Sequence, residues 1–84
     1  MTPLVAERAG EIRSVVCRVL EVDDAAVTET ALFVDELGAD SMKLLELLAN
    51  LEIEFDVEVD ESEFPRLINL QGVYDVLGAA LDNR

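Results

Sequence analysis

Apolar residues recur at spacings of three and four in three separate segments of this 84-residue chain, which is the period of an amphipathic α-helix. The segments cover about residues 2–20, 41–55 and 69–81. Residues 56–59 alternate like a strand, but the chain offers no second strand to pair with them, so we expect an extended connection there. The pattern predicts an all-α fold: a small antiparallel bundle of three longer helices and one short helix, in a single domain over residues 1–84.

The same spacing predicts which side of each helix faces the core. The residues expected there are Val5, Ala9, Ile12, Val15, Val16, Val19 and Leu20 in the first helix, Leu44, Leu47, Leu48, Leu51 and Phe55 in the second, and Leu70, Val73, Leu77 and Ala80 or Leu81 in the third. Cys17 is expected to pack as a small buried hydrophobe, and as the single cysteine it excludes an internal disulfide.

The connection between the first two helices, residues 21–40, is predicted to be long because it shows no periodic pattern. Connections of this length in compact domains are usually functional or contain a short helix. Its apolar residues are expected to hold it to the core; they are Val27, Leu32, Phe33, Val34 and Leu37.

Capping residues indicate where the helices begin. Thr2 and Pro3 are typical of a helix cap and first turn. Residues 60–63 resemble a capping box, and Pro65 limits the short helix there to a turn or two. Asn69 is predicted to cap the last helix.

The chain is strongly acidic, with 19 acidic against 6 basic side chains and a formal net charge of −13. Such a surface repels nucleic acid and anionic membranes and suits basic protein partners. No signal-peptide pattern and no apolar run of about 18 residues is present, so we expect a cytoplasmic protein, and we expect it to be a monomer. We expect no metal site, because histidine is absent and the acidic run 56–63 lacks the central glycine of a calcium loop.

Ser41 stands at the start of the second helix, after the turn sequence Leu-Gly-Ala-Asp. A nucleophilic serine needs a general base, normally histidine, so the sequence argues against a hydrolase and against catalysis by this chain. Two interpretations of the residues remain. Either Asp40 or Ser41 simply caps the helix, or Ser41 carries a covalent phosphate group, which the N–H groups and dipole of a helix N-terminus favour.

The stretch FVDELGADSMKLLELLANLEIEF closely resembles the central motif of acyl carrier proteins, and the resemblance continues through VEVDESEFPRLINLQGVYDVL, covering about residues 12–81. It implies that Ser41 carries a 4'-phosphopantetheine arm, which a phosphopantetheinyl transferase takes from coenzyme A. It also implies that Asp40 is the motif acid and that Met42 contacts the arm or a partner. The implied function is to hold acyl groups as thioesters and shuttle them between enzymes of fatty acid or polyketide-type biosynthesis. Lys43 and Pro65 depart from the fatty-acid carriers.

A second apolar stripe is predicted on the helix that begins at Ser41, on the side away from the core. It consists of Met42, Leu45, Ala49 and Ile53, and is bordered by Glu46, Glu52 and Asp56. An apolar stripe with acidic borders suggests a docking surface for basic acyl-loading and condensing enzymes. The alternative is that the stripe packs under the short helix or the long loop.

Two other functions remain open from the sequence. The first is a discrete aminoacyl or peptidyl carrier that uses the same arm for a different cargo. The second, from a different class, is an acidic helical adaptor that is never modified. Because the chain starts at Met1 and ends near its last helix, it resembles a discrete protein, and a domain excised from a larger synthase is the alternative that the sequence leaves open.

Overall fold

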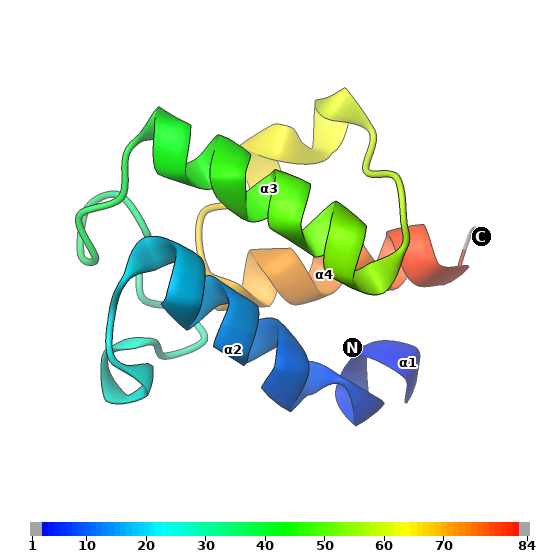
Figure 1. The fold of residues 1–84 in the computed structure, drawn as a ribbon, viewed down its shortest axis with the longest axis horizontal. Helices are drawn as coiled ribbons and strands as arrows, with labels where there is room; N and C mark the ends of the chain where they lie inside the picture. The colour runs from blue at the N-terminus through cyan, green and yellow to red at the C-terminus, as the bar shows by residue number, and fades with distance from the viewer. Residues whose placement is uncertain (1–2, 83–84) are drawn as a thin grey trace.

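A computed structural model describes residues 3–82 (Figure 1). Its elements in chain order are α1 (Pro3–Glu7), α2 (Ala9–Leu20), the 3₁₀ helix η1 (Asp24–Ala26), α3 (Ser41–Phe55), the 3₁₀ helix η2 (Glu61–Arg66) and α4 (Leu70–Asp82). No strand occurs in this range, and residues 57–60 are extended without pairing. The all-α prediction is confirmed, with α2 and α3 antiparallel and α4 running behind them in the view of Figure 1.

The first helix is not continuous as predicted, because it breaks at Arg8 into α1 and α2. Arg8 leaves the helical region (φ −112°, ψ 13°), and its guanidinium lies 4.2 Å from the ring centroid of Phe55. The break turns α1 onto α4, where Val5 is completely buried. Spacing alone did not reveal the break, because Val5 in α1 and the inward residues of α2 fit one continuous helical period. Thr2, the predicted cap, lies outside the described residues.

The core forms where the inward faces of α2, α3 and α4 meet, largely as predicted from spacing. The buried side chains on these helices are Ile12, Val15, Val16, Val19 and Leu20 on α2, Leu47, Leu51 and Phe55 on α3, and Leu70, Val73, Tyr74, Val76, Leu77 and Leu81 on α4. Ala9, Cys17, Leu44, Leu48 and Ala80 are only partly buried against them. Cys17 is therefore less buried than expected, and its Sγ faces an Asp24 carboxylate oxygen at 3.9 Å.

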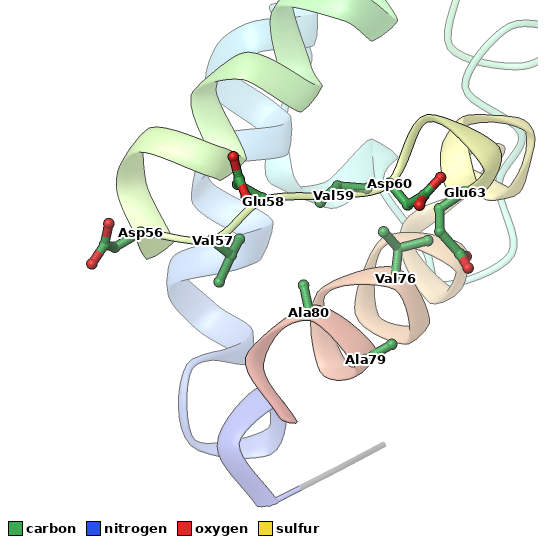
Figure 2. Close-up of a pocket in the computed structure, with 9 residues that line it drawn as sticks. All are labelled: Asp56, Val57, Glu58, Val59, Asp60, Glu63, Val76, Ala79 and Ala80. Carbon is green, nitrogen blue, oxygen red and sulfur yellow. The ribbon is translucent and has the colours of Figure 1, made fainter. Parts of the chain in front are cut away.

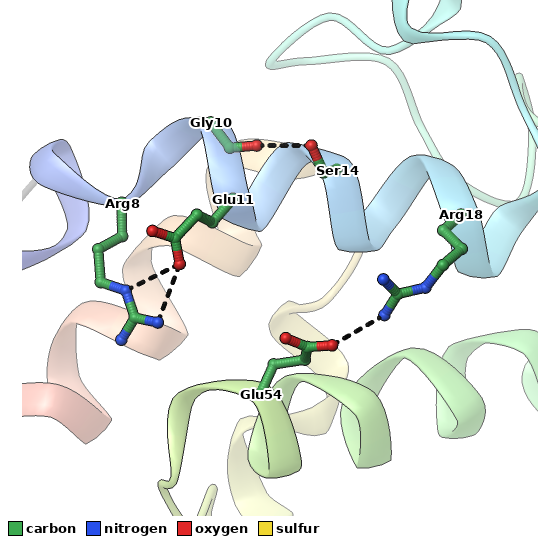
Figure 3. Close-up of polar contacts among 6 residues, drawn as sticks. All are labelled: Arg8, Gly10, Glu11, Ser14, Arg18 and Glu54. Carbon is green, nitrogen blue, oxygen red and sulfur yellow. Dashed lines mark hydrogen bonds and ion pairs between the residues drawn. The ribbon is translucent and has the colours of Figure 1, made fainter.

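Polar contacts tie α2 to α3 at the surface. Arg18 pairs with Glu54 at 3.2 Å across the two helices, as Figure 3 shows. Lys43 pairs with Glu21 at 2.8 Å, at the opposite end of α3. These exposed pairs contribute little to the free energy of unfolding. They do neutralise charge along the side of α3 that faces α2.

The long connection contains η1 and is held to the core mainly by Phe33, which is completely buried. The Phe33 N–H donates to the Ile68 carbonyl at 2.9 Å, which joins this connection to the segment before α4. Val27 is also buried, and its carbonyl accepts a hydrogen bond from the Arg13 guanidinium. Val34 was predicted as a further anchor, and that prediction is wrong, because its side chain is 51% exposed. Phe33 takes the inward position, and its neighbour in the same turn points outward.

The connection between α3 and α4 is shaped by two caps. The Asp60 carboxylate accepts from the Ser62 N–H at 2.8 Å, and this hydrogen bond lowers the pKa of Asp60. Glu63 pairs with Arg66 at 2.7 Å, so its side chain is not the reciprocal half of a capping box. The Asn69 side chain accepts from the Gly72 N–H at 2.8 Å, which confirms it as the cap of α4.

Phe33→Ala tests whether the long connection depends on one buried ring. Removing a fully buried phenylalanine side chain should lower the free energy of unfolding by about 3–5 kcal/mol. Val34→Ala is the matched control, and its exposed side chain should matter by less than about 0.5 kcal/mol. Urea unfolding followed by circular dichroism measures both, and similar losses in the two variants would contradict the assignment.

Candidate functional site

Ser41 is the first residue of α3, and the residue before it caps the helix. Asp40 is extended (φ −119°, ψ −178°), and its carboxylate accepts from the Lys43 N–H at 2.9 Å. The Ser41 side chain is exposed and makes no hydrogen bond with residues 3–82. Asp40 is thus the cap that sequence analysis left open between two residues, and the Ser41 hydroxyl is left free.

The turn before Ser41 is tightly organised, although it belongs to the long connection. The Leu32 N–H donates to the Glu36 carboxylate at 2.8 Å, and the Ala39 N–H donates to the Phe33 carbonyl at 2.8 Å. Gly38 has a φ of 75°, in the left-handed region that favours glycine. Ala39 is buried, so the chain is anchored immediately before Asp40. These contacts hold Ser41 at a defined place on the surface.

Within residues 3–82, no side chain that could act as a general base is hydrogen-bonded to the Ser41 hydroxyl. Histidine is absent, and the nearest amine in sequence, Lys43, is held by the Glu21 carboxylate at 2.8 Å and lies 3.9 Å from Glu46. The hydrogen bond with Glu21 raises the pKa of Lys43, and the same bond lowers the pKa of Glu21. Lys43 therefore stays protonated at neutral pH and cannot activate the serine.

The predicted second stripe on α3 is exposed along its whole length. Met42 is 66% exposed, Leu45 51% and Ile53 80%, and Ala49 is exposed as well. The alternative that these residues pack under η2 or the long connection is therefore wrong. We refer to Met42, Leu45, Ala49 and Ile53 as the α3 stripe. It begins next to Ser41 and continues toward the other end of the helix.

The acids predicted to border the α3 stripe differ in what they contact. Glu46 is exposed, with Lys43 at 3.9 Å. The Glu52 carboxylate accepts from the Val59 N–H at 3.0 Å, so it also organises the connection after α3. Asp56 ends the helix in the left-handed conformation (φ 52°), and its side chain is exposed.

Sequence analysis did not identify one exposed apolar residue near the Ser41 end of the molecule. Ile68 is 52% exposed, and its carbonyl accepts from Phe33, the residue beside the exposed Val34. The two side chains therefore belong to segments that adjoin the turn before Ser41. No periodic signal could have found Ile68, because its position depends on a contact between distant segments.

None of the helices within residues 3–82 is long and apolar enough to cross a membrane.

Comparison with known proteins matches residues 10–77 to the family model described as a phosphopantetheine attachment site. The chain is 45% identical over 82 residues to polyketide-8 synthase acyl carrier protein 1 of Streptomyces avermitilis, covering 98% of both chains. It is 38% identical over 71 residues to polyketide-8 synthase acyl carrier protein 2 of the same organism, covering 84% of this chain and 82% of that protein.

Solved structures share the fold. A chain in the structure of the ishigamide ketosynthase/chain length factor has a TM-score of 0.74 at 35% identity, covering 94% of this chain and 96% of that one. A structure from Mycobacterium tuberculosis described as an acyl carrier protein has a TM-score of 0.76 at 30% identity, covering 83% and 93%.

Gly38→Ala tests the turn that presents Ser41. A Cβ at a φ of 75° should lower the free energy of unfolding by about 1–2 kcal/mol. Gly10→Ala is the matched control, because a Cβ there meets nothing within 4 Å in helix α2. It should be neutral or stabilise by up to about 1 kcal/mol. Urea denaturation of both variants gives the comparison, and equal changes would count against strain at Gly38.

Proposed function

This chain belongs to the phosphopantetheine-attachment family of acyl carrier proteins, and we propose that Ser41 is the residue that bears its 4'-phosphopantetheine arm. The family is non-catalytic, and its members are substrates of partner enzymes. The observation that carries the assignment is the free, exposed hydroxyl of Ser41 at the first position of α3, beside a cap supplied by Asp40.

The surroundings of Ser41 suit a covalently attached phosphodiester. The Asp40 carboxylate accepts from one backbone N–H of the first turn, that of Lys43. The helix dipole places partial positive charge at this end of α3, which favours a phosphate there. Gly38 and the buried Ala39 hold the serine outward. When attached, the arm supplies a thiol that holds the cargo as a thioester. The chain itself needs no base, because the transferase that attaches the arm supplies that chemistry.

We assign the carrier to polyketide-type biosynthesis. Both Streptomyces avermitilis relatives are named as polyketide synthase carriers, and the first matches almost the whole chain. The competing assignment is an aminoacyl or peptidyl carrier. The intact mass of the protein purified from its host distinguishes an acyl cargo from an aminoacyl or peptidyl cargo. The unmodified adaptor is disfavoured by membership of the family.

Partner enzymes are proposed to dock on the α3 stripe. Its exposed apolar side chains, Met42, Leu45 and Ile53, provide a small contact area that suits brief encounters. The acidic surface, at a net charge of −13, steers partners with basic patches and opposes self-association. The expected partners are the phosphopantetheinyl transferase and the acyl-loading and condensing enzymes, and the expected state is a monomer.

Ser41→Ala should abolish arm attachment and leave the fold intact. The change in the free energy of unfolding should be under about 0.5 kcal/mol, since Asp40 supplies the cap. Intact mass after incubation with coenzyme A and a phosphopantetheinyl transferase measures attachment. Ser62→Ala, which removes another exposed serine, is the control and should be modified normally. A mass gain in the Ser41→Ala protein would refute the site.

Leu45→Gln tests the docking role of the α3 stripe. Losing an apolar contact of about 1 kcal/mol should slow single-turnover arm attachment by about fivefold. Leu4→Gln is the matched control, because Leu4 on α1 is similarly exposed, at 46% against 51%. Neither change should move the melting temperature appreciably. Equal rates in the two variants would exclude the stripe as the docking surface for that transferase.

A further inference from the structure

A hollow of about 480 Å³ lies between the connection that follows α3 and the outer side of α4. Its apolar floor is made of Val57, Val76, Ala79 and Ala80. Figure 2 shows Val57 and Ala80 directed into the space between the connection and the helix. The volume falls in the range of about 300–1,000 Å³ typical of binding pockets, so the hollow can hold ligand side chains.

Acidic residues line the edge of this hollow without matching cations among residues 3–82. Asp56, Glu58, Asp60 and Glu63 line the hollow, and no lysine or arginine among residues 3–82 does. Arg66 pairs with Glu63 at 2.7 Å from outside the lining. Within residues 3–82, Asp56 and Glu58 are exposed and have no ion-pair partner. The rim therefore carries excess negative charge next to an apolar surface.

The chemistry of the hollow excludes several occupants. Anionic ligands are repelled by the rim. Its acids do not converge as metal ligands, since no group of three or more candidate ligands in the described part of the chain could hold an ion. A second copy of this chain is opposed by its net charge of −13.

We propose that the hollow binds a basic, partly apolar peptide segment of a partner protein. Arginine and lysine bury an aliphatic stem and keep a charged head at the surface. The stems fit the floor formed by Val57, Val76 and Ala80, and the heads meet the acidic rim, where Figure 2 shows Asp60 and Glu63 close to Val76. Charged hydrogen bonds of guanidinium groups to carboxylates then fix the segment.

The position of the hollow gives this site a distinct role. It adjoins Asp56 at the end of α3, whereas Ser41 begins that helix. At 1.5 Å per residue, the 15 residues of α3 separate the two ends by about 20 Å. A segment bound here leaves Ser41 accessible, so it can tether the carrier while the arm visits different enzymes. That a synthase component supplies the segment rests on the proposed function, but the site itself does not.

The test uses the full chain, ¹⁵N-labelled, and a short peptide of alternating arginine and leucine blocked at both ends. Titration should produce saturable chemical-shift changes at residues 56–60 and 76–80. Glu58→Lys should weaken binding by about tenfold, because it reverses charge at the rim. Asp23→Lys is the matched control with the same change in net charge, at an exposed acid beyond α2, and should bind almost normally.

Two further variants address the floor of the hollow. Ala80→Leu fills the hollow and should weaken peptide binding. Ala79→Leu serves the same purpose if the first variant fails to fold. Three results would overturn the proposal: shifts centred on the α3 stripe, equal losses in Glu58→Lys and Asp23→Lys, or equal binding of a peptide with glutamine in place of arginine. Arm attachment at Ser41, measured on the same proteins, should be unchanged, so failure of either proposal is seen separately.

Discussion

The burial of one face of α3 is the constraint on which the rest of the structure depends. Leu47, Leu51 and Phe55 are almost completely buried in the core that α3 shares with α2 and α4. A domain of this size buries only about 60% of its unfolded surface, so the helix must commit this face to stability. The opposite side of α3 is consequently released from packing. Its exposed apolar residues, Met42 and Ile53 among them, are available for function.

At the start of α3, two neighbouring residues have different roles: one caps the helix, and the other is the proposed attachment site. Asp40 satisfies a backbone N–H of the first turn, and the hydroxyl of Ser41 makes no hydrogen bond with the described residues, 3–82. Lys43 is held away by Glu21, which lies at the end of α2. This arrangement suits a protein that is acted upon by other enzymes. The helix N-terminus supplies a favourable potential for the proposed phosphate, and the sequence has no histidine that could activate the hydroxyl.

Charge is distributed unevenly around α3. On the side facing α2, charges cancel within two ion pairs, Arg18 with Glu54 and Lys43 with Glu21. Beyond the last turn, Asp56 and Glu58 have no cation beside them within residues 3–82. The unpaired negative charge of the described residues around α3 therefore gathers at the end of the helix that lies away from Ser41. The two proposed sites serve different needs. The hollow would keep a partner segment bound, and the α3 stripe would let partner enzymes bind and leave in turn.

The sequence by itself determined the bounds of α3, the inward faces of the three longer helices and the exposed stripe, because these depend on local capping and on helical period. Only the tertiary structure decided the break at Arg8, the exposure of Val34 and Ile68, and the hollow beside Ala80. Each arises where segments distant in sequence meet: α1 on α4, the long connection on the segment before α4, and residues 57–60 on α4. Contacts of this kind leave no period in the sequence, since the partner residue, not the local spacing, sets which side chain is buried.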